Sequence, residues 1–573
     1  MNKTIISRNP KFDLLKTDLS LSQRILANRG LDPNEEIDYG LANLLSFELL
    51  KDIDKAVALL FEVIKQQQKI LIVGDFDADG ATSSALCKLV LQQFGAQYVD
   101  YLVPNRFDYG YGLSPELVSL AKDKNPDLII TVDNGISSIE GVKKAKSLGI
   151  KVLITDHHLA GDELPEADAI INPNQPDDEF PSKNLAGVGV VFYLLLALRA
   201  YLREQQWFEQ NDLPEPNLAH YLDLVALGTV ADLVPLDTNN RILVKQGLRL
   251  IKAGKARLGI AELLSLAKRK LPKVKSSDLG FAVGPRLNAA GRLDDMSLGI
   301  ECLLAQDKAT ANEYAQILHS LNSDRQEVEQ DMQQDALQIL AEQDFNSAFE
   351  HSICLYQEHW HQGVVGLLAS RVKDKLNKPC IVFANDSEET LKGSARSVKQ
   401  VHIRDALALV NAKHPALIDK FGGHAMAAGL SLKKSNLPEF EAAFDQAVEL
   451  LLNGKSIENS IETDGVLQNH ELNLQSVSEL ETLGPFGQAF PEPLFHGDFK
   501  VLSQRIVGKN HLKLQLQPVD SNQAISAIAF RVEPEHWIEP VQTIRAAYQL
   551  DINDYYEQAE LQLIIQYLEP LRT

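Results

Sequence analysis

Three aspartates lie close together within the first hundred residues. They are Asp75, Asp77 and Asp79, in a Gly-Asp-Phe-Asp-Ala-Asp-Gly segment that follows an apolar run. Alternate residues of an extended backbone project to the same side, so these carboxylates are expected to face one another. Carboxylates that crowd in this way repel unless a cation neutralises them. The segment therefore predicts a site for divalent metal ions.

Two simpler interpretations compete with a metal site. An EF-hand calcium loop also begins Asp-x-Asp-x-Asp-Gly, but its twelfth position is a bidentate glutamate, and that position here is Leu86. A solvated acidic loop is the other interpretation. It is less favoured because the segment follows a predicted strand, and open α/β sheets bind ligands at the carboxyl ends of their strands.

Two further predicted strands end in residues that can bind metals. Asp133 follows the run 128–132, and Asp156, His157 and His158 follow the run 152–155. A lone aspartate at a strand end is usually a helix cap. Three such strand ends along the chain are harder to explain as caps. A further acid, Asp232, lies in an apolar stretch where an unpaired charge would be costly.

These side chains supply enough ligands for two divalent ions. Oxygen ligands with one or two imidazoles favour Mn²⁺ or Mg²⁺ over zinc. Two such ions about 3.5–4 Å apart can activate a water molecule and stabilise the leaving oxygen of a phosphate ester. The predicted chemistry is metal-dependent phosphodiester hydrolysis.

The surrounding pattern predicts the elements that position these residues. Short apolar runs separated by helical stretches, which begin near residues 81, 114 and 138, are typical of a mainly parallel, doubly wound sheet. Helical patterns then dominate from 185 to 305, and residues 309–341 lack Gly and Pro, which predicts a long connecting helix. The predicted strands of the sheet are 69–73, 98–103, 128–132, 152–155 and 169–171.

A second α/β unit and a small barrel are predicted beyond that helix. Two strands, 352–356 and 380–383, flank a helix at 364–376. Five alternating runs then predict a barrel, for which an oligonucleotide-binding (OB) fold is one candidate on strand number alone. These runs are 499–506, 512–516, 525–530, 544–550 and 561–568.

Composition limits the other possibilities. The 573 residues predict several domains. The longest apolar run, 188–198, is too short to cross a membrane, and no secretion signal is expected at the start. The cysteines are scattered, which argues against a zinc site or disulfide framework and favours the cytoplasm. They are Cys87, Cys302, Cys354 and Cys380.

The net charge and the local distribution of charge point to different conclusions about a nucleic-acid partner. The net charge of −22 argues against one. Between Arg241 and Lys275, however, basic residues outnumber acidic ones strongly, with Glu262 as the single acid. A solvated pair of helices explains this strip most simply. A local basic strip on an acidic body also suits an enzyme that guides a polyanion into one groove.

The metal-binding segments, taken in order, resemble a known superfamily. Asp77-x-Asp79, Asp133, Asp156-His157-His158 and the segment 228–232 are similar to the four motifs of the DHH phosphoesterases. Later segments narrow the resemblance to the RecJ family of single-stranded-DNA-specific exonucleases. Segment 284–293 resembles the end of its DHH domain, 421–429 the glycine-rich signature of its DHHA1 domain, and 483–493 the lead-in to its OB domain.

The resemblance implies an α/β multidomain fold with five parts. It has a mainly parallel DHH-type sheet domain, a long connecting helix, a DHHA1-type α/β domain and a C-terminal OB-type β-barrel. The expected boundaries are an N-terminal segment at 1–60, the DHH catalytic domain at 61–305, the connecting helix at 306–345, the DHHA1 domain at 346–455 and the OB domain at 456–573.

The resemblance also implies roles for individual residues. The metal ligands are Asp77, Asp79, Asp133, His157 and Asp232, with Asp75 standing where some relatives have a histidine. Asp133 is expected to act on both ions, and His158 to contact the phosphate. The expected substrate-binding residues are Arg106, Tyr109, Arg286, Asn288, Ser394, Arg396 and His424.

The implied function is a 5′→3′ exonuclease that degrades single-stranded DNA with two Mn²⁺ or Mg²⁺ ions, in DNA repair and recombination. Single-stranded-DNA-binding protein is an implied partner. One alternative is another DHH enzyme, such as a nano-RNase, a cyclic-dinucleotide phosphodiesterase or a manganese pyrophosphatase, although these lack the barrel. The other is a non-catalytic single-strand-binding replication factor, which is disfavoured because the acidic motifs are intact.

Overall fold

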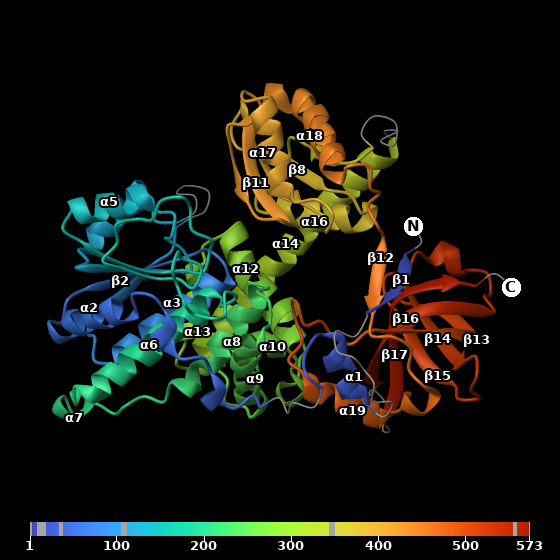
Figure 1. Cartoon of the computed structure of the whole chain (residues 1–573), viewed down its shortest axis with the longest axis horizontal. Coiled ribbons are helices and arrows are strands. Elements are labelled where there is room, and N and C mark those ends of the chain that lie inside the picture. Colours follow the sequence, from blue (N-terminus) through green and yellow to red (C-terminus); the bar gives the residue numbers. More distant parts are fainter. Residues whose placement is uncertain are drawn as a thin grey trace. The chain divides into compact units, whose positions relative to one another are not determined.

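The chain folds into two compact units. The computed structural model describes residues 3–8, 19–33, 38–104, 112–342, 350–553 and 559–571. The first unit contains Met1–Leu287, Met296–Gln316 and Ser460–Thr573, and the second contains Asn288–Asp295 and Ile317–Asn459. Figure 1 shows both units coloured along the sequence.

A five-stranded, wholly parallel sheet forms the centre of the first unit's α/β domain. Its strand order is β3-β2-β4-β5-β6, so the chain winds outward in opposite directions from β2 and β4. Ligands bind at such a switch point in doubly wound sheets. The predicted parallel sheet is confirmed. Its strands are β2 (Ile70–Gly74), β3 (Val99–Leu102), β4 (Leu128–Val132), β5 (Lys151–Thr155) and β6 (Ala169–Ile171).

Helices cover both faces of this sheet (Figure 1). On one face α4 (Pro115–Ala121) and α5 (Ile139–Ser147) pack against strand residues such as Ile129. On the other, α2 (Ile53–Lys65), α3 (Ala78–Gln93) and α6 (Gly187–Glu204) contact the strands. Every residue of β2 and β4 is buried as a result, which accounts for their uninterrupted apolar sequences.

Further helices complete the first unit. The buried helix α8 packs against both α3 and α9, while α10 packs against α13. No helix within the described residues is long and apolar enough to span a membrane. The remaining helices of this unit are α1 (Leu21–Asn28), α7 (Trp207–Gln210), α8 (Leu222–Ala231), α9 (Thr238–Lys252), α10 (Leu258–Leu266), α11 (Ser276–Asp278), α13 (Ser297–Leu304) and α19 (Leu474–Leu483).

The second unit is a mixed α/β domain. Its sheet order is β10-β11-β9-β8-β7, in which only β7 and β8 are parallel. Two helices, α12 (Gly284–Leu293) and α14 (Lys308–Glu342), begin in the first unit and continue into the second, and α14 confirms the predicted long helix. The other elements are β7 (Ile353–Tyr356), β8 (Cys380–Asn385), β9 (Thr390–Arg396), β10 (Lys420–Gly423), β11 (Ala427–Lys433), α16 (Val365–Leu376), α17 (Ile403–Lys413) and α18 (Leu437–Leu452).

The C-terminal strands close into a barrel, as predicted. Their order is β13-β14-β15-β17-β16, with β13 and β16 paired to close it and β15 and β17 parallel. Numbered from the first strand, this is the 1-2-3-5-4 order of a five-stranded OB barrel. The strands are β13 (Phe495–Val507), β14 (His511–Pro518), β15 (Ile525–Ala529), β16 (Thr543–Asn553) and β17 (Glu560–Pro570).

Strand pairing and ion pairs hold the N-terminal segment beside the barrel. Strand β1 (Thr4–Ser7) pairs in parallel with β12 (Ser460–Thr463), and the next residue, Asp464, has a fully buried side chain. Its carboxylate lies 3.1 Å from Arg8 Nη1 and 3.4 Å from Arg29 Nη2. It also accepts a hydrogen bond from the Leu494 amide at 3.0 Å. One acid therefore links segments from the two ends of the chain.

The basic strip between residues 241 and 275 is not wholly solvated. Arg241 is only 2% exposed, and its guanidinium carbon lies 3.7 Å from the centroid of the Phe490 ring. It also donates a hydrogen bond to the Leu483 carbonyl oxygen at 2.7 Å. Arg241 therefore anchors the segment that leads into the barrel and is unavailable to a polyanion.

Replacing Asp464 with alanine is expected to destabilise the docked barrel by about 3–5 kcal/mol, because Arg29 is left buried without its partner. Burial already lowers the pKa of Arg29 to about 10, although the negative charge of Asp464 acts to raise it. The measurement is the urea midpoint from Trp537 fluorescence, in a background where Trp207 and Trp360 are phenylalanine.

Asp498→Ala is the matched control for this change. Asp498 forms a more exposed ion pair with Arg545 in the same barrel, at 2.7 Å, and its loss should cost below about 1 kcal/mol. Equal midpoints for the two variants would contradict the anchoring role of Asp464.

Candidate metal centre

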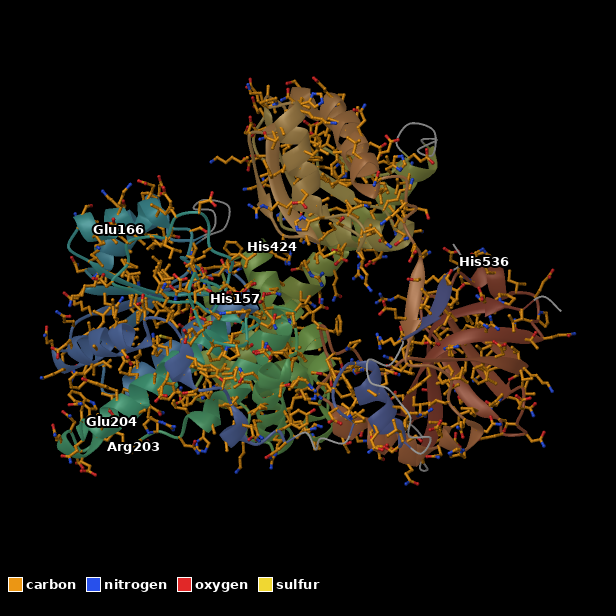
Figure 2. The ribbon with its side chains drawn as sticks, viewed as in Figure 1. His157, Glu166, Arg203, Glu204, His424 and His536 are labelled. Carbon is orange, nitrogen blue, oxygen red and sulfur yellow. The ribbon has the colours of Figure 1, made fainter. Side chains whose placement is uncertain are left out.

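The carboxyl ends of three adjacent parallel strands meet at the switch point of the first sheet. Asp75 follows β2, Asp133 follows β4, and Asp156 and His157 follow β5. Asp75, Asp133 and Asp156 are almost completely buried. Figure 2 labels His157 in this domain. Strand order, rather than proximity in the sequence, therefore brings these side chains together.

The predicted extended arrangement of the first three aspartates is wrong. Helix α3 begins at Ala78, three residues earlier than expected. Asp77 is its N-cap and accepts hydrogen bonds from the amides of Asp79 at 2.9 Å and Gly80 at 3.1 Å. Aspartate is a strong N-cap, and the helix dipole favours acids in the first turn. The carboxylates converge because of the start of a helix.

Asp79 is held by the start of a second helix, which the sequence analysis did not identify as part of the site. Its two carboxylate oxygens accept hydrogen bonds from the amides of Gly187 at 2.6 Å and Val188 at 2.9 Å, where α6 begins. The Gly-Val-Gly sequence that opens α6 was the available signal, because glycines permit close backbone approach.

The ligand atoms form overlapping groups of three. Asp75, Asp77 and Asp133 each offer an oxygen to one group, within 4.8 Å of one another, and Asp79, His157 and Asp232 form another. His157 Nε2 lies 3.1 Å from an Asp133 oxygen and 3.4 Å from an Asp232 oxygen. Adjacent ligands of an octahedral ion with bonds near 2.1 Å are about 3 Å apart. These spacings fit ligands of a shared ion.

Electrostatics also fit a cation at this position. Burial and the neighbouring Asp77 raise the pKa of Asp79 to about 7. Burial, followed by the charges of Asp79 and Asp77, raises the pKa values of Asp133 and Asp232 well above the usual range. Each carboxylate makes the next harder to ionise, and divalent cations reverse this effect. The donor set of carboxylates and imidazole suits Mn²⁺ or Mg²⁺.

His158 has a different environment from His157. Its Nδ1 lies 2.8 Å from an oxygen of the buried Asp156, which also accepts hydrogen bonds from the amides of His157 and His158. Burial opposes protonation of His158, but the Asp156 hydrogen bond raises its pKa to about 9. The His158 side chain is 34% exposed, against 12% for His157. Asp156 thus orients a more accessible cationic ring at the rim of the site.

Two of the predicted phosphate-binding residues lie side by side in the second unit. Arg396 Nη1 is 3.1 Å from the Ser394 hydroxyl on β9. A Cβ atom added at Gly366, in the first turn of α16, would lie within 3.0 Å of both side chains. A guanidinium and a hydroxyl at a helix N-terminus make a cradle suited to an anion.

The remaining predicted substrate residues are dispersed. His424 is exposed in the turn between β10 and β11 (Figure 2), and β11 pairs with β9 so that Ala427 lies opposite Arg396. Asn288 lies on α12 in the second unit. Arg286 lies on α12 in the first unit and donates to the Ala282 carbonyl oxygen at 2.5 Å. Arg106 and Tyr109 lie outside the described residues.

Comparisons with known proteins first identify the class. Residues 69–229 match the DHH family, N-terminal domain, and this range contains Asp75, Asp133 and His157. Residues 348–450 match the DHHA1 domain. Residues 463–567 match the RecJ OB domain. The fold and the metal centre are those of a DHH phosphoesterase with its accessory domains.

Relatives identify the family within that class. The single-stranded-DNA-specific exonuclease RecJ of Escherichia coli is 48% identical over 96% of this chain and 96% of the relative. The protein of the same name from Haemophilus influenzae gives the same three percentages. The crystal structure of RecJ in complex with Mn²⁺ from Thermus thermophilus matches with a TM-score of 0.80 at 27% identity, covering 100% of this chain and 80% of that one. The chain belongs to the RecJ family.

Gly187→Ala is expected to weaken Mn²⁺ binding by roughly ten- to a hundredfold, the range for second-sphere changes at metal sites. A Cβ atom there would lie 2.6 Å from Asp133 Cβ and 2.8 Å from Asp133 Oδ1, so the carboxylate must move. Isothermal titration with Mn²⁺ measures the effect. The control is Gly161→Ala, whose Cβ would lie 3.9 Å from the Glu163 carbonyl oxygen. Equal Mn²⁺ affinities in both variants would contradict the role of Asp133 as a ligand.

Proposed function

We propose that this protein is a single-stranded-DNA-specific exonuclease that removes nucleotides from the 5′ end by two-metal phosphodiester hydrolysis, in DNA repair and recombination. The observation that carries the proposal is the set of buried and half-buried carboxylates and imidazole at the switch point, in a chain of the RecJ family. In this proposal residues 61–305 supply catalysis, and residues 346–455 and 456–573 contribute to DNA binding. Helix 306–345 connects these parts.

Asp133 has the central catalytic position in this proposal. It shares one group with Asp75 and Asp77 and another with His157 and His158, so it is suited to bridge two ions. Bound divalent ions supply an activated water and neutralise charge on the phosphate. Asp79 and Asp232 complete the ligand set with His157. His158 contacts the phosphate, supported by its exposure at the rim and its ion pair with Asp156.

The barrel offers a surface for unpaired bases. Phe530 is 53% exposed, and its ring packs edge-on against His511 with centroids 5.3 Å apart. Arg505 and Lys513 lie opposite each other on β13 and β14, close along the chain to this pair. Aromatic rings that stack on bases, together with cations that contact phosphates, are how OB barrels bind single strands.

The arginines are proposed to bind the terminal phosphate. Arg106, Arg286 and Arg396 contribute guanidinium groups, with Ser394, Asn288 and His424 as polar contacts and Tyr109 as a stacking residue. Support comes from the Arg396–Ser394 cradle at the start of α16. Arginine binds phosphate oxygens with two parallel hydrogen bonds, which favours it over lysine for end recognition.

Partner and location follow as further parts of the proposal. We propose single-stranded-DNA-binding protein as a partner, on the family resemblance alone. A cytoplasmic location is supported by the cysteines, all four of which are buried free thiols. Neither alternative function fits as well, because the RecJ OB domain sets this chain apart from smaller DHH enzymes and the intact ligand set argues against a non-catalytic protein.

Asp133→Ala is expected to reduce the hydrolysis rate to below a few per cent of the wild-type rate in saturating Mn²⁺, because the bridging carboxylate is lost. Folding and much of the DNA affinity should remain. The assay follows 5′-labelled single-stranded and duplex oligonucleotides with and without Mn²⁺. The exposed Asp162→Ala should match the wild type. A wild-type protein that degrades neither substrate, or an active Asp133→Ala, would refute the proposal.

Arg286→Ala is expected to slow degradation of 5′-phosphorylated oligonucleotides about ten- to a hundredfold, because one charge-assisted contact to the phosphate is lost. The penalty should be smaller on the matching 5′-hydroxyl strand, which lacks the phosphate. Arg203→Ala, an exposed arginine paired with Glu215, is the control and should affect neither. Equal losses on the two strands would mean that Arg286 supports the fold or an internal phosphate.

A further inference from the structure

A short π-helical segment, Leu279–Val283, directly precedes α12. Its Phe281 side chain is 80% exposed, which is more than any other large apolar side chain in the described part of the chain. Leu279 and Val283, at the ends of the segment, are fully buried. π-Helical turns are rare and are frequent at functional sites. The segment therefore has a fixed backbone that presents one aromatic ring to solvent.

This segment is packed against the helix that ends at the metal centre. A Cβ atom added at Gly280 would lie 3.2 Å from Val230 Cγ1, and one added at Gly284 would lie 3.1 Å from Ala231 Cβ. Both neighbours belong to the last turn of α8, and the next residue is Asp232. Phe281 therefore belongs to a segment that packs against the turn directly before Asp232, the carboxylate that shares a metal group with His157.

A second exposed apolar residue adjoins the same carboxylate in the sequence. Leu233 directly follows Asp232, is 62% exposed and has a φ of +61°. The left-handed region is unusual for a bulky residue, and such backbone strain clusters at ligand-binding sites. Exposed apolar side chains that gather beside polar chemistry indicate a surface for a ligand with an apolar part.

Arg286, which is proposed above to bind the terminal phosphate, is hydrogen-bonded to the segment that carries the aromatic ring. Its Nη1 donates to the Ala282 carbonyl oxygen, within the π-helical segment itself. A guanidinium and an aromatic ring are thereby held on neighbouring turns of one rigid backbone. A nucleotide offers the same pair of features, an anionic phosphate and a flat apolar base.

We propose that Phe281 stacks on an unpaired base of the strand held at the metal centre. This inference rests on the proposed function and adds a selectivity residue to it. A base within a duplex has both faces covered by its neighbours, whereas a single-stranded base can lie against the ring. Phe281 therefore makes productive placement of the strand depend on an unpaired base, close to the reacting phosphate.

The test compares wild type, Phe281→Ala and Phe281→Trp on a series of single-stranded oligonucleotides, each with one abasic site at a successive position from the 5′ end. Loss of one base–aromatic stack should reduce kcat/KM for the intact strand about five- to a hundredfold in Phe281→Ala. Phe281→Trp should stay near the wild type. For the wild type, an abasic site at one particular position should reduce kcat/KM by a similar factor, because the base that stacks on Phe281 is missing. On that same substrate Phe281→Ala should have the same kcat/KM as the wild type, because the stack is already lost.

Controls separate this inference from failure of the proposed function. Mn²⁺ affinity should be unchanged in Phe281→Ala, because no ligand is altered. Tyr98→Ala removes another exposed aromatic ring, 54% accessible and preceding β3 at the opposite end of the strands, and should leave kcat/KM unchanged. If the wild type degrades single strands but Phe281→Ala loses nothing, or loses equally at every abasic position, Phe281 has no stacking role. An inactive wild type would instead refute the exonuclease proposal.

Discussion

Repulsion among buried carboxylates is the constraint on which the rest of the structure depends. Asp75 and Asp133 offer oxygens to one group of ligand atoms, and Asp79 and Asp232 to another. Asp75, Asp79 and Asp133 are buried, and the Asp232 side chain is 23% exposed. Such a cluster is stable only when positive charge faces it. Part of that charge comes from the fold, because Asp77 caps α3 and Asp79 accepts amides at the start of α6. Metal ions supply the rest.

The site's chemistry could be predicted from the sequence because each ligand follows a recognisable strand or apolar run. Asp133 and His157 were placed correctly at strand ends, and the parallel order of those strands brought them together. The local geometry around Asp79 could not be predicted in the same way. Its partners Gly187 and Val188 are more than a hundred residues away, and no spacing rule links them to it.

In the second unit the strands were predictable only where they are buried and apolar. The runs at 352–356 and 380–383 were recognised because β7 and β8 are largely buried. Strands β9, β10 and β11 were missed because each contains glycine, which weakens the strand pattern. Arg396 and Ser394 both lie on β9, so their proximity could not be predicted either.

The pairing of β1 with β12 has a consequence for how the chain is made. Arg8 and Asp464 are 456 positions apart. At typical rates of protein synthesis, roughly 5–20 residues per second, the first strand leaves the ribosome about 20–90 s before its partner exists. An unpaired strand is a site for wrong association during that interval. β1 has only four residues, and so short an edge lowers the risk of aggregation before β12 is synthesised.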